Sequence, residues 1–136
     1  MTFQNLFNTW QDMRTFCSGE AVFEEGDTAE AMYFILEGEM EIQRRGSVMS
    51  VEGPGGIIGE SALLDGATHN STAVAQSDAR LARLDRGQLK KLMDRDADFA
   101  LHVMARLALR LRSVDARIGA RIESADRTDD KADGTA

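Results

Sequence analysis

The sequence predicts a mainly β domain with a helical lead at its N-terminal side and helices at its C-terminal side. From residue 20 to residue 86, glycines separate short apolar stretches at near-regular spacing, a pattern typical of short strands joined by turns. After Asp85 the glycines become sparse and helix-forming residues take over. Together these observations predict a small antiparallel β-barrel or sandwich followed by a pair of helices.

The first 16 residues form a short amphipathic lead. Its apolar residues recur at helical spacing: Phe3, Leu6, Phe7, Trp10 and Met13. We expect a helix over residues 1–16 that packs its apolar face on the domain.

Three stretches are the clearest strand candidates, namely residues 32–36, 40–43 and 80–84. Glycines at turn positions separate them, and Pro54 marks a loop because proline cannot donate to a central ladder. The apolar run 32–36 is expected to lie in the core and not to serve as a platform for a stacked base.

Two helices are expected after the strands. Asp85 is a plausible N-cap, and Gln88 three residues later completes a capping-box pattern. Leu89, Leu92 and Met93 then share one face. A second helix is expected to start near Asp96 or Asp98 and to run to about residue 123.

The second predicted helix carries an apolar seam. Its members are spaced alternately by four and three residues: Ala100, Met104, Leu107, Leu111, Val114 and Ile118. This is the seven-residue repeat of a coiled coil, and charged residues flank it in the later turns. The pattern favours a homodimer through this helix, while packing wholly within the monomer stays open. The expected organisation is therefore a lead over 1–16, one domain over 17–124 and a small, polar, disordered tail over 125–136.

Composition excludes several classes of protein. The chain has 136 residues and a net charge of −7, which argues against a nucleic-acid-binding surface because phosphate contacts need clustered Lys and Arg. No apolar run approaches the length of a membrane span, and the first ten residues do not resemble a signal peptide. The single cysteine, Cys17, favours a cytoplasmic location and is expected to be buried and structural.

The most informative stretch is residues 56–74, GIIGESALLDGATHNSTAV. Gly59 precedes the carboxylate of Glu60 and the small residues Ser61 and Ala62. Glycine permits the tight backbone in which N–H groups converge on an anion. A neighbouring carboxylate can accept hydrogen bonds from a sugar hydroxyl.

This stretch resembles the phosphate-binding cassette of cyclic-nucleotide-binding domains, F-G-E-x-A-L-L-x-G-x-P-R-S-A-T-V. The matching residues are Gly59, Glu60, Ala62, Leu63, Leu64, Gly66 and Thr72, and the similarity extends over roughly residues 16–120. The resemblance implies a jelly roll (double-stranded β-helix) with a short cassette helix. It also implies cyclic AMP or cyclic GMP as the ligand, with no cofactor and no metal. Residues 59–72 are hereafter called the cassette.

The resemblance also implies a ligand site. In the family, an arginine and backbone N–H groups hold the cyclic phosphate and the glutamate holds the ribose. The corresponding positions here are Ile58, Gly59, Glu60, Ser61, Ala62, His69, Asn70, Ser71 and Thr72. Base recognition would come from the C-terminal helix, within residues 95–106.

The cassette departs from the family pattern where the arginine is expected. His69 stands at that position and Thr68 replaces the preceding proline. A histidine is cationic only below a pKa of about 6.5, so His69 is either a partial substitute for the arginine or a solvated loop residue. A loop longer by one residue would put Asn70 there instead.

Other residues near the predicted site have their own alternatives. Arg80 and Arg83 lie on a predicted strand and could reach the pocket, although a solvated face of the barrel is the simpler reading. Glu60 could cap the cassette helix instead of binding a ligand. These alternatives stay open at the level of the sequence.

Catalysis is not expected. The chain has two histidines, His69 and His102, which is too few for a cupin-like metal site, and no nucleophile triad is visible. The expected function is a stand-alone regulatory domain that senses a cyclic nucleotide or related anionic ligand. It would signal through its C-terminal helix to an unknown downstream protein, without contacting DNA or a membrane. The alternative is an interaction module with a degenerate pocket that dimerises without any nucleotide.

Overall fold

The computed structural model describes residues 3, 5–109 and 111. The chain divides into two compact units, Met1–Ala100 and residues 101–136. All named strands and helices lie in the first unit. They are β1 Met13–Phe16, β2 Ala21–Phe23, β3 Ala31–Glu37, β4 Met40–Arg44, β5 Ser47–Glu52, β6 Ile57–Ile58, α1 Glu60–Asp65, β7 Thr72–Ala75, β8 Ala79–Asp85 and α2 Arg86–Arg95.

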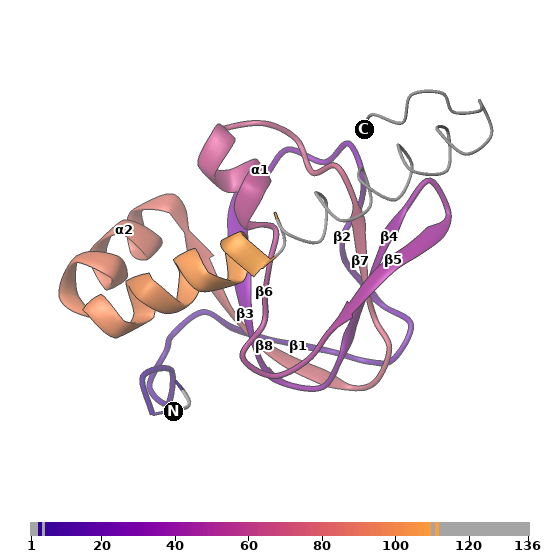
Figure 1. The fold of residues 1–136 in the computed structure, drawn as a ribbon. Coiled ribbons are helices and arrows are strands. Elements are labelled where there is room, and N and C mark those ends of the chain that lie inside the picture. The colour runs from indigo at the N-terminus through magenta and orange to yellow at the C-terminus, as the bar shows by residue number, and fades with distance from the viewer. Residues whose placement is uncertain (1–2, 4, 110, 112–136) are drawn as a thin grey trace, which may run out of the picture. The chain divides into compact units, whose positions relative to one another are not determined.

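The strands form two four-stranded sheets, one in the order β1-β8-β3-β6 and the other in the order β2-β7-β4-β5 (Figure 1). The pairs within each sheet are antiparallel. This confirms the predicted mainly β fold, and the three strand candidates correspond to β3, β4 and β8. Strands distant in sequence are neighbours, as when β4 pairs with β7.

The first sheet is apolar on both faces at β3. Residues 31–36 of β3 are all buried. Tyr33 and Ile35 belong to the core cluster together with Phe23 of β2 and Met40 of β4. An uninterrupted apolar run is the pattern expected of a strand covered on both faces, and it confirms that this stretch is core.

The other face of β3 is covered by an aromatic cluster. Phe34 stacks on Phe7 with ring centroids 4.8 Å apart, and Phe3, Trp10 and Phe99 complete the group. Phe7 and Phe99 are 0% exposed. The N-terminal segment therefore packs on the domain, as its apolar residues predict.

The expectation of a helix over residues 1–16 is wrong for the residues described. Residues 5–9 form turns, and Met13–Phe16 is strand β1. Two contacts with β8 explain the change, because the indole N–H of Trp10 donates to the carbonyl of Arg83 at 2.9 Å and Met13 pairs with Ala82. Pairing with a free sheet edge satisfies the backbone that a longer helix would otherwise satisfy internally.

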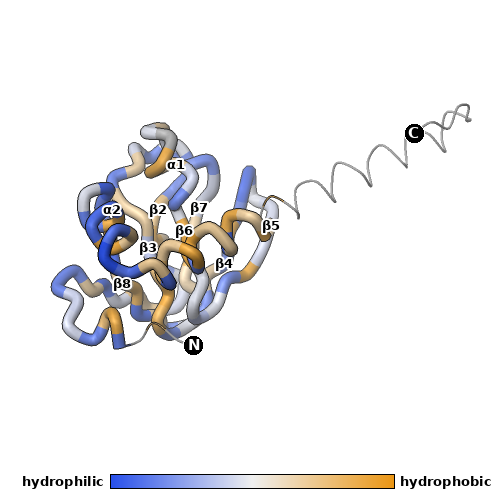
Figure 2. Tube along the Cα trace, turned by 60° about the vertical axis from the view of Figure 1, so that its left-hand side comes forward, coloured by the Kyte–Doolittle hydropathy of each residue, from blue (hydrophilic) through white to orange (hydrophobic). Residues whose placement is uncertain are grey.

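The C-terminal helices begin where their capping residues predict. Asp85 and Gln88 form a complete capping box at the start of α2, and Leu89 and Leu92 are buried. Figure 2 shows hydrophobic and hydrophilic residues along α2, as an amphipathic helix requires. A further helix covers residues 97–109, and the carboxylate of Asp96 accepts from Phe99 N at 3.0 Å.

Cys17 is exposed, so the expectation of a buried structural cysteine is wrong. It follows the edge strand β1 and precedes the turn at Gly19, where φ is 94°. The predicted tail 125–136 lies outside the described residues, and among them no helix is both long and apolar enough to span a membrane.

Candidate functional site

The candidate site is built around the junction of β6 and α1. Ile57 and Ile58 pair with Phe34 and Tyr33 on β3, and both isoleucines are buried. Gly59 then turns the chain into α1 with φ at 78°, in the left-handed region. This conformation is readily available only to glycine. Gly59 therefore allows the chain to turn directly from the buried strand β6 into α1.

The space around Gly59 is also tight. A Cβ at this position would lie 3.1 Å from Cε1 of His69 and 3.2 Å from Cε2 of Phe23. Cε1 lies between the two nitrogens of an imidazole, so the polar edge of His69 faces the residue that caps α1. Gly59 and His69, which are separated in the sequence, are therefore direct neighbours in the folded domain.

Glu60 is a buried carboxylate at the first residue of α1. It is 1% exposed, and its Oε2 accepts from the backbone N–H of Ser61 at 3.0 Å. This bond is to the adjacent residue, and α1 has Gly59 at its N-cap and no side-chain cap hydrogen bond, so the alternative that Glu60 caps the helix is not confirmed. The role of Glu60 in ligand binding stays a prediction.

The loop that carries His69 is held by the β2–β3 loop. Gly26 N donates to His69 O, and His69 N donates to Asp27 O, both at 2.9 Å. A bridge between Thr28 and Thr68 continues this antiparallel contact. Backbone hydrogen bonds therefore fix the position of His69, and the same contact brings Asp27 close to the imidazole.

His69 is stacked and buried. Its ring lies on Phe23 with centroids 3.8 Å apart and planes 9° apart, and the residue is 6% exposed. The alternative of a solvated loop histidine is therefore wrong. Burial lowers the pKa of His69 below its usual 6.5, and the carboxylate of Asp27 opposes part of that change. The imidazole is mainly neutral at pH 7 when no ligand is bound.

The remaining predicted site residues differ in exposure. Ala62 is buried, Ser71 and Thr72 are half-buried, and Ser61 and Asn70 are exposed. Oγ1 of Thr72 accepts from the backbone N–H of Glu25 at 3.0 Å. This contact leaves the hydroxyl hydrogen of Thr72 available for a ligand.

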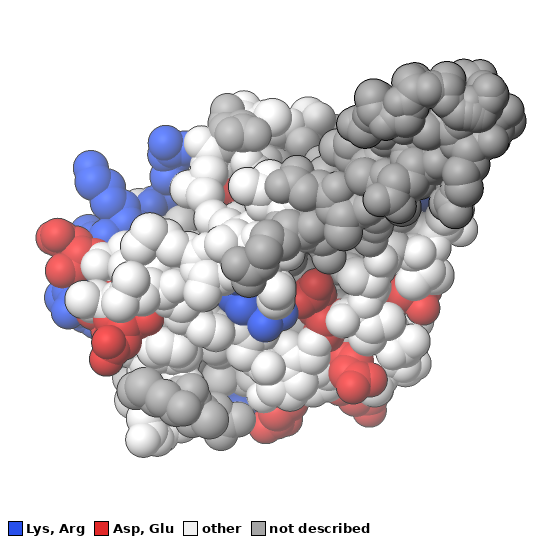
Figure 3. Space-filling model, in the orientation of Figure 1, with Lys and Arg blue, Asp and Glu red and all other residues white. Residues whose placement is uncertain are grey.

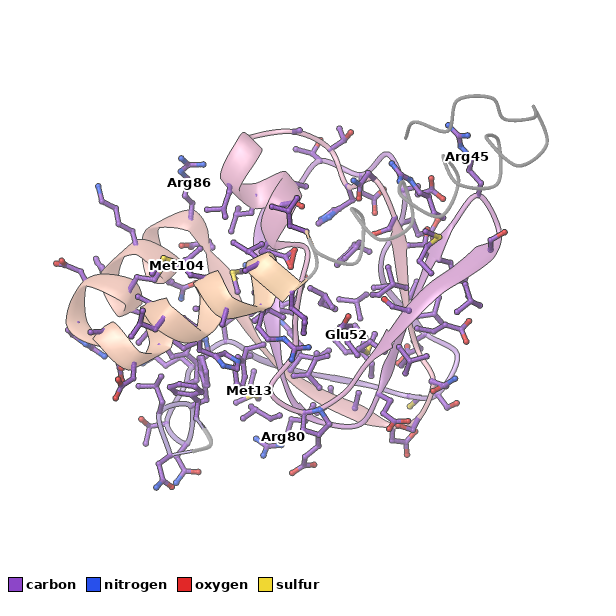
Figure 4. The ribbon with its side chains drawn as sticks, in the orientation of Figure 1. Met13, Arg45, Glu52, Arg80, Arg86 and Met104 are labelled. Atoms are coloured by element: carbon purple, nitrogen blue, oxygen red, sulfur yellow. The ribbon has the colours of Figure 1, made fainter. Side chains whose placement is uncertain are left out.

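The two strand arginines are engaged in ion pairs. Arg80 pairs with Glu37 at 3.0 Å, and Arg83 pairs with Asp12 at 3.3 Å. Figure 4 places Arg80 at the end of the sheets far from α1. Arg80 therefore does not reach the cassette, and its side chain is 37% exposed, in agreement with the favoured interpretation of a solvated barrel face. Arg83 is the ion-pair partner of Asp12.

Arg86 is the residue near the cassette that the sequence interpretation missed. Its Nη1 donates to the carbonyls of Leu63 and Leu64, at 3.0 and 3.2 Å. The sequence did contain a signal for this contact. A cation in the first turn of a helix opposes the helix dipole, so the position of Arg86 indicates a partner outside its own helix. Phe23 was missed too, and nothing in its local sequence marks it.

The seam residues that the structure describes lie in the second unit, except Ala100. Met104 and Leu111 are 52% and 62% exposed, whereas Ala100 and Leu107 are half-buried. Leu101 and Leu109 are also exposed, at 61% and 48%. Val114 and Ile118 lie outside the described residues. The helix thus carries an exposed apolar face that includes only part of the predicted seam.

Charge is unevenly distributed over the first unit. Figure 3 shows Lys and Arg gathered toward the side where α2 lies, and α2 contains Arg86, Lys90, Lys91 and Arg95.

No group of three or more His, Cys, Asp or Glu placed to hold a metal ion is found among the described residues.

A family model described as "Cyclic nucleotide-binding domain" matches residues 13–96, which is more than half of the chain. The chain belongs to this family. The match includes both sheets, the cassette and α2. The resemblance seen in the cassette residues is therefore confirmed for the fold and for the family.

Individual relatives agree with this assignment. The chain is 32% identical over 107 residues to the cyclic AMP receptor protein of Thermus thermophilus, covering 75% of this chain and 50% of that protein. It is 29% identical over 90 residues to the cGMP-dependent protein kinase egl-4 of Caenorhabditis elegans, covering 66% of this chain and 11% of the kinase. The chain thus spans half or less of the length of these relatives.

Solved structures share the fold. The catabolite activator protein of Thermus thermophilus superimposes with a TM-score of 0.74 at 30% identity, over 85% of this chain and 57% of that chain. A structure from work on a cyclic-GMP-dependent signalling pathway that regulates bacterial phytopathogenesis superimposes with a TM-score of 0.68 at 29% identity. It is covered to 95%, and this chain to 83%.

Proposed function

We propose that this domain is a regulatory domain that binds cyclic AMP or cyclic GMP at the cassette and passes the binding event on through its C-terminal helix. Family membership supports a cyclic nucleotide as the ligand class. The observation that carries the proposal is the buried carboxylate of Glu60, positioned by Gly59 at the start of α1. In this proposal Glu60 accepts from the ribose hydroxyl.

The phosphate would be bound without an arginine. Backbone N–H groups at the N-terminal end of α1 would supply donors, with the N–H of Ser61 exchanging its bond to Glu60 Oε2 for one to the phosphate. The hydroxyls of Ser71 and Thr72 would supply further donors. The polar edge of His69 faces Gly59 in the same place. A charge-assisted hydrogen bond contributes about 1.5–3 kcal/mol, so its replacement should weaken binding by about ten- to a hundred-fold.

Binding should be linked to proton uptake by His69. Burial lowers the pKa of His69 in the free domain, and a bound phosphate beside the imidazole would raise the pKa again. A pKa that is higher in the complex than in the free domain makes binding tighter at lower pH. We therefore expect the cyclic nucleotide to bind more strongly near pH 6 than near pH 8.

The proposed output is a change in a homodimer. The exposed apolar side chains of Leu101, Met104 and Leu111 would pack against the same helix of a second copy. A downstream protein would then sense the change. The role is regulatory and not catalytic, at a cytoplasmic location, and the proposal involves neither nucleic acid nor membrane contact.

Isothermal titration calorimetry of the purified chain with cyclic AMP and with cyclic GMP, at pH 6 and pH 8, tests the proposal. The matched variant is His69→Arg, which restores the family cation. Binding by the wild type that weakens at pH 8 supports the proposal. The variant is expected to bind more tightly, with a smaller difference between the two pH values.

Two outcomes contradict the proposal. If the wild type does not bind and His69→Arg does, the cassette can still accommodate a nucleotide, but a cyclic nucleotide is not the ligand of the wild-type domain. Absence of binding by both proteins, with both folded by circular dichroism, would leave the interaction module as the function.

A further inference from the structure

Arg86 connects two elements that the sequence separates. It is the first residue of α2, and its guanidinium Nη1 donates to Leu63 O at 3.0 Å and to Leu64 O at 3.2 Å. Both carbonyls belong to the last turn of α1. Figure 4 shows the Arg86 side chain rising above α2 beside α1.

These carbonyls lack partners within α1. The last four carbonyls of an α-helix have no intrahelical donor, and α1 has only six residues. The N–H of Gly66 reaches Ala62 O and Leu63 O, whereas Leu64 O receives the guanidinium of Arg86. Arg86 therefore completes the C-terminal end of the cassette helix.

The charge of Arg86 suits α1 and not its own helix. A cation is favourable at the C-terminal end of a helix and unfavourable at the N-terminal end. Arg86 stands at the N-terminal end of α2, where Asp85 supplies the cap. Its favourable electrostatic interaction is thus with α1, which makes the contact between the two helices specific.

We propose that Arg86 is a positioning residue that couples the cassette helix α1 to the start of α2. A displacement of α1 larger than the Arg86 side chain can follow would either break the two hydrogen bonds or move the first turn of α2 with it. The proposed function enters this coupling at one point: nucleotide binding at the opposite end of α1 would be the event that displaces α1. The contact itself is a feature of the structure and does not depend on that trigger.

A double-mutant cycle read by amide hydrogen exchange tests the coupling without a ligand. Leu64→Gly weakens the last turn of α1, because glycine in a helix raises local opening by about fivefold. Arg86→Gln removes the guanidinium. We expect Leu64→Gly to accelerate exchange in α2 severalfold when Arg86 is present, and to leave α2 unchanged in the Arg86→Gln background.

Two further variants serve as controls for the double-mutant cycle. Arg95→Gln removes an exposed arginine from the other end of α2 and should leave the response of α2 to Leu64→Gly intact. Arg86→Lys keeps the charge and one donor group, so it should retain part of the response. An equal acceleration of α2 with and without Arg86, or none in either background, would overturn the proposal.

A second arm adds cyclic AMP or cyclic GMP to the same proteins. Nucleotide should change exchange in α1 in every protein, and should change exchange in α2 only when Arg86 is present. An α2 response of equal size in Arg86→Gln would overturn the coupling. If neither nucleotide changes α1 in the wild type, the proposed function fails, while the ligand-free cycle still decides the role of Arg86.

Discussion

The imidazole of His69 lies flat on the ring of Phe23, with centroids 3.8 Å apart and planes 9° apart. Phe23 is on β2 and His69 is in the loop before β7, the strand that pairs with β2, so the stack joins this loop to β2. It holds the histidine against Gly59 at the start of α1. His69 is therefore buried against the residues that support the cassette.

Stability should fall at mildly acidic pH because of His69. Its pKa in the folded domain is lowered by burial, so the unfolded chain binds a proton first as the pH falls. The contribution is constant above about pH 6.5 and is lost progressively below it, by about 1.4 kcal/mol for each unit of pKa difference. Urea unfolding at pH 7.5 and pH 5.5 measures this loss.

The control for this prediction is His69→Phe, which keeps an aromatic ring on Phe23 and removes the titrating group. The loss between the two pH values should be smaller in the variant than in the wild type. Asp12, whose pKa is lowered first by its hydrogen bond with Arg14, loses its contribution only below about pH 4. Equal losses in both proteins would contradict the assignment to His69.

Gly59→Ala should destabilise the domain more than Gly66→Ala. Both glycines have positive φ, at 78° and 69°, so both substitutions carry the left-handed penalty of about 1–2 kcal/mol. Only at Gly59 would the new Cβ crowd His69 and Phe23, at 3.1 and 3.2 Å. We expect about 1–3 kcal/mol more destabilisation at Gly59, measured by urea unfolding. Equal effects would show that the crowding is relieved without cost.

Phe7→Ala should destabilise the domain by about 3–5 kcal/mol, since removal of a buried phenylalanine leaves a cavity. Phe7 is 0% exposed and stacks on Phe34. The matched control is Asn8→Ala, which alters an exposed neighbour and should change stability by less than about 0.5 kcal/mol. If thermal unfolding gives similar melting temperatures for both variants, the N-terminal segment is not part of the core.

Met104→Glu combined with Leu111→Glu should convert a dimer into a monomer. Both side chains are more than half exposed in the single chain, and a carboxylate buried in a coiled-coil interface is strongly unfavourable. Sedimentation equilibrium measures the mass. Val48→Glu, on exposed β5, adds charge elsewhere and should leave the mass unchanged. A monomeric wild type would contradict the proposed homodimer.

Local patterns in the sequence predicted much of the fold. Apolar runs identified β3, β4 and β8, and the Asp85–Gln88 pair identified the start of α2, because these features depend on neighbours in sequence. The lead was predicted as a helix because apolar spacing cannot reveal a pairing with β8, about 70 positions away. Strand pairing across the chain decided that segment.

The site was predictable in part. The resemblance implied a short cassette helix, and the structure has α1 starting at Glu60 after Gly59, whereas the ligand roles of these residues stay predictions. The environment of His69 depends on Phe23, 46 positions upstream, so its burial could not be read from the cassette. The pairing of Arg86 with the carbonyls of α1 is likewise a contact between distant segments.

The most direct test of the central claim is a titration followed through the histidine Hε1–Cε1 signals in a ¹H–¹³C NMR spectrum. The chain has two histidines, and His69→Gln assigns the signal of His69. We predict that cyclic AMP or cyclic GMP shifts the His69 signal to saturation, and that Glu60→Gln weakens this binding by about ten- to a hundred-fold. A His69 signal that stays unchanged with both nucleotides at millimolar concentration would contradict nucleotide binding at the cassette.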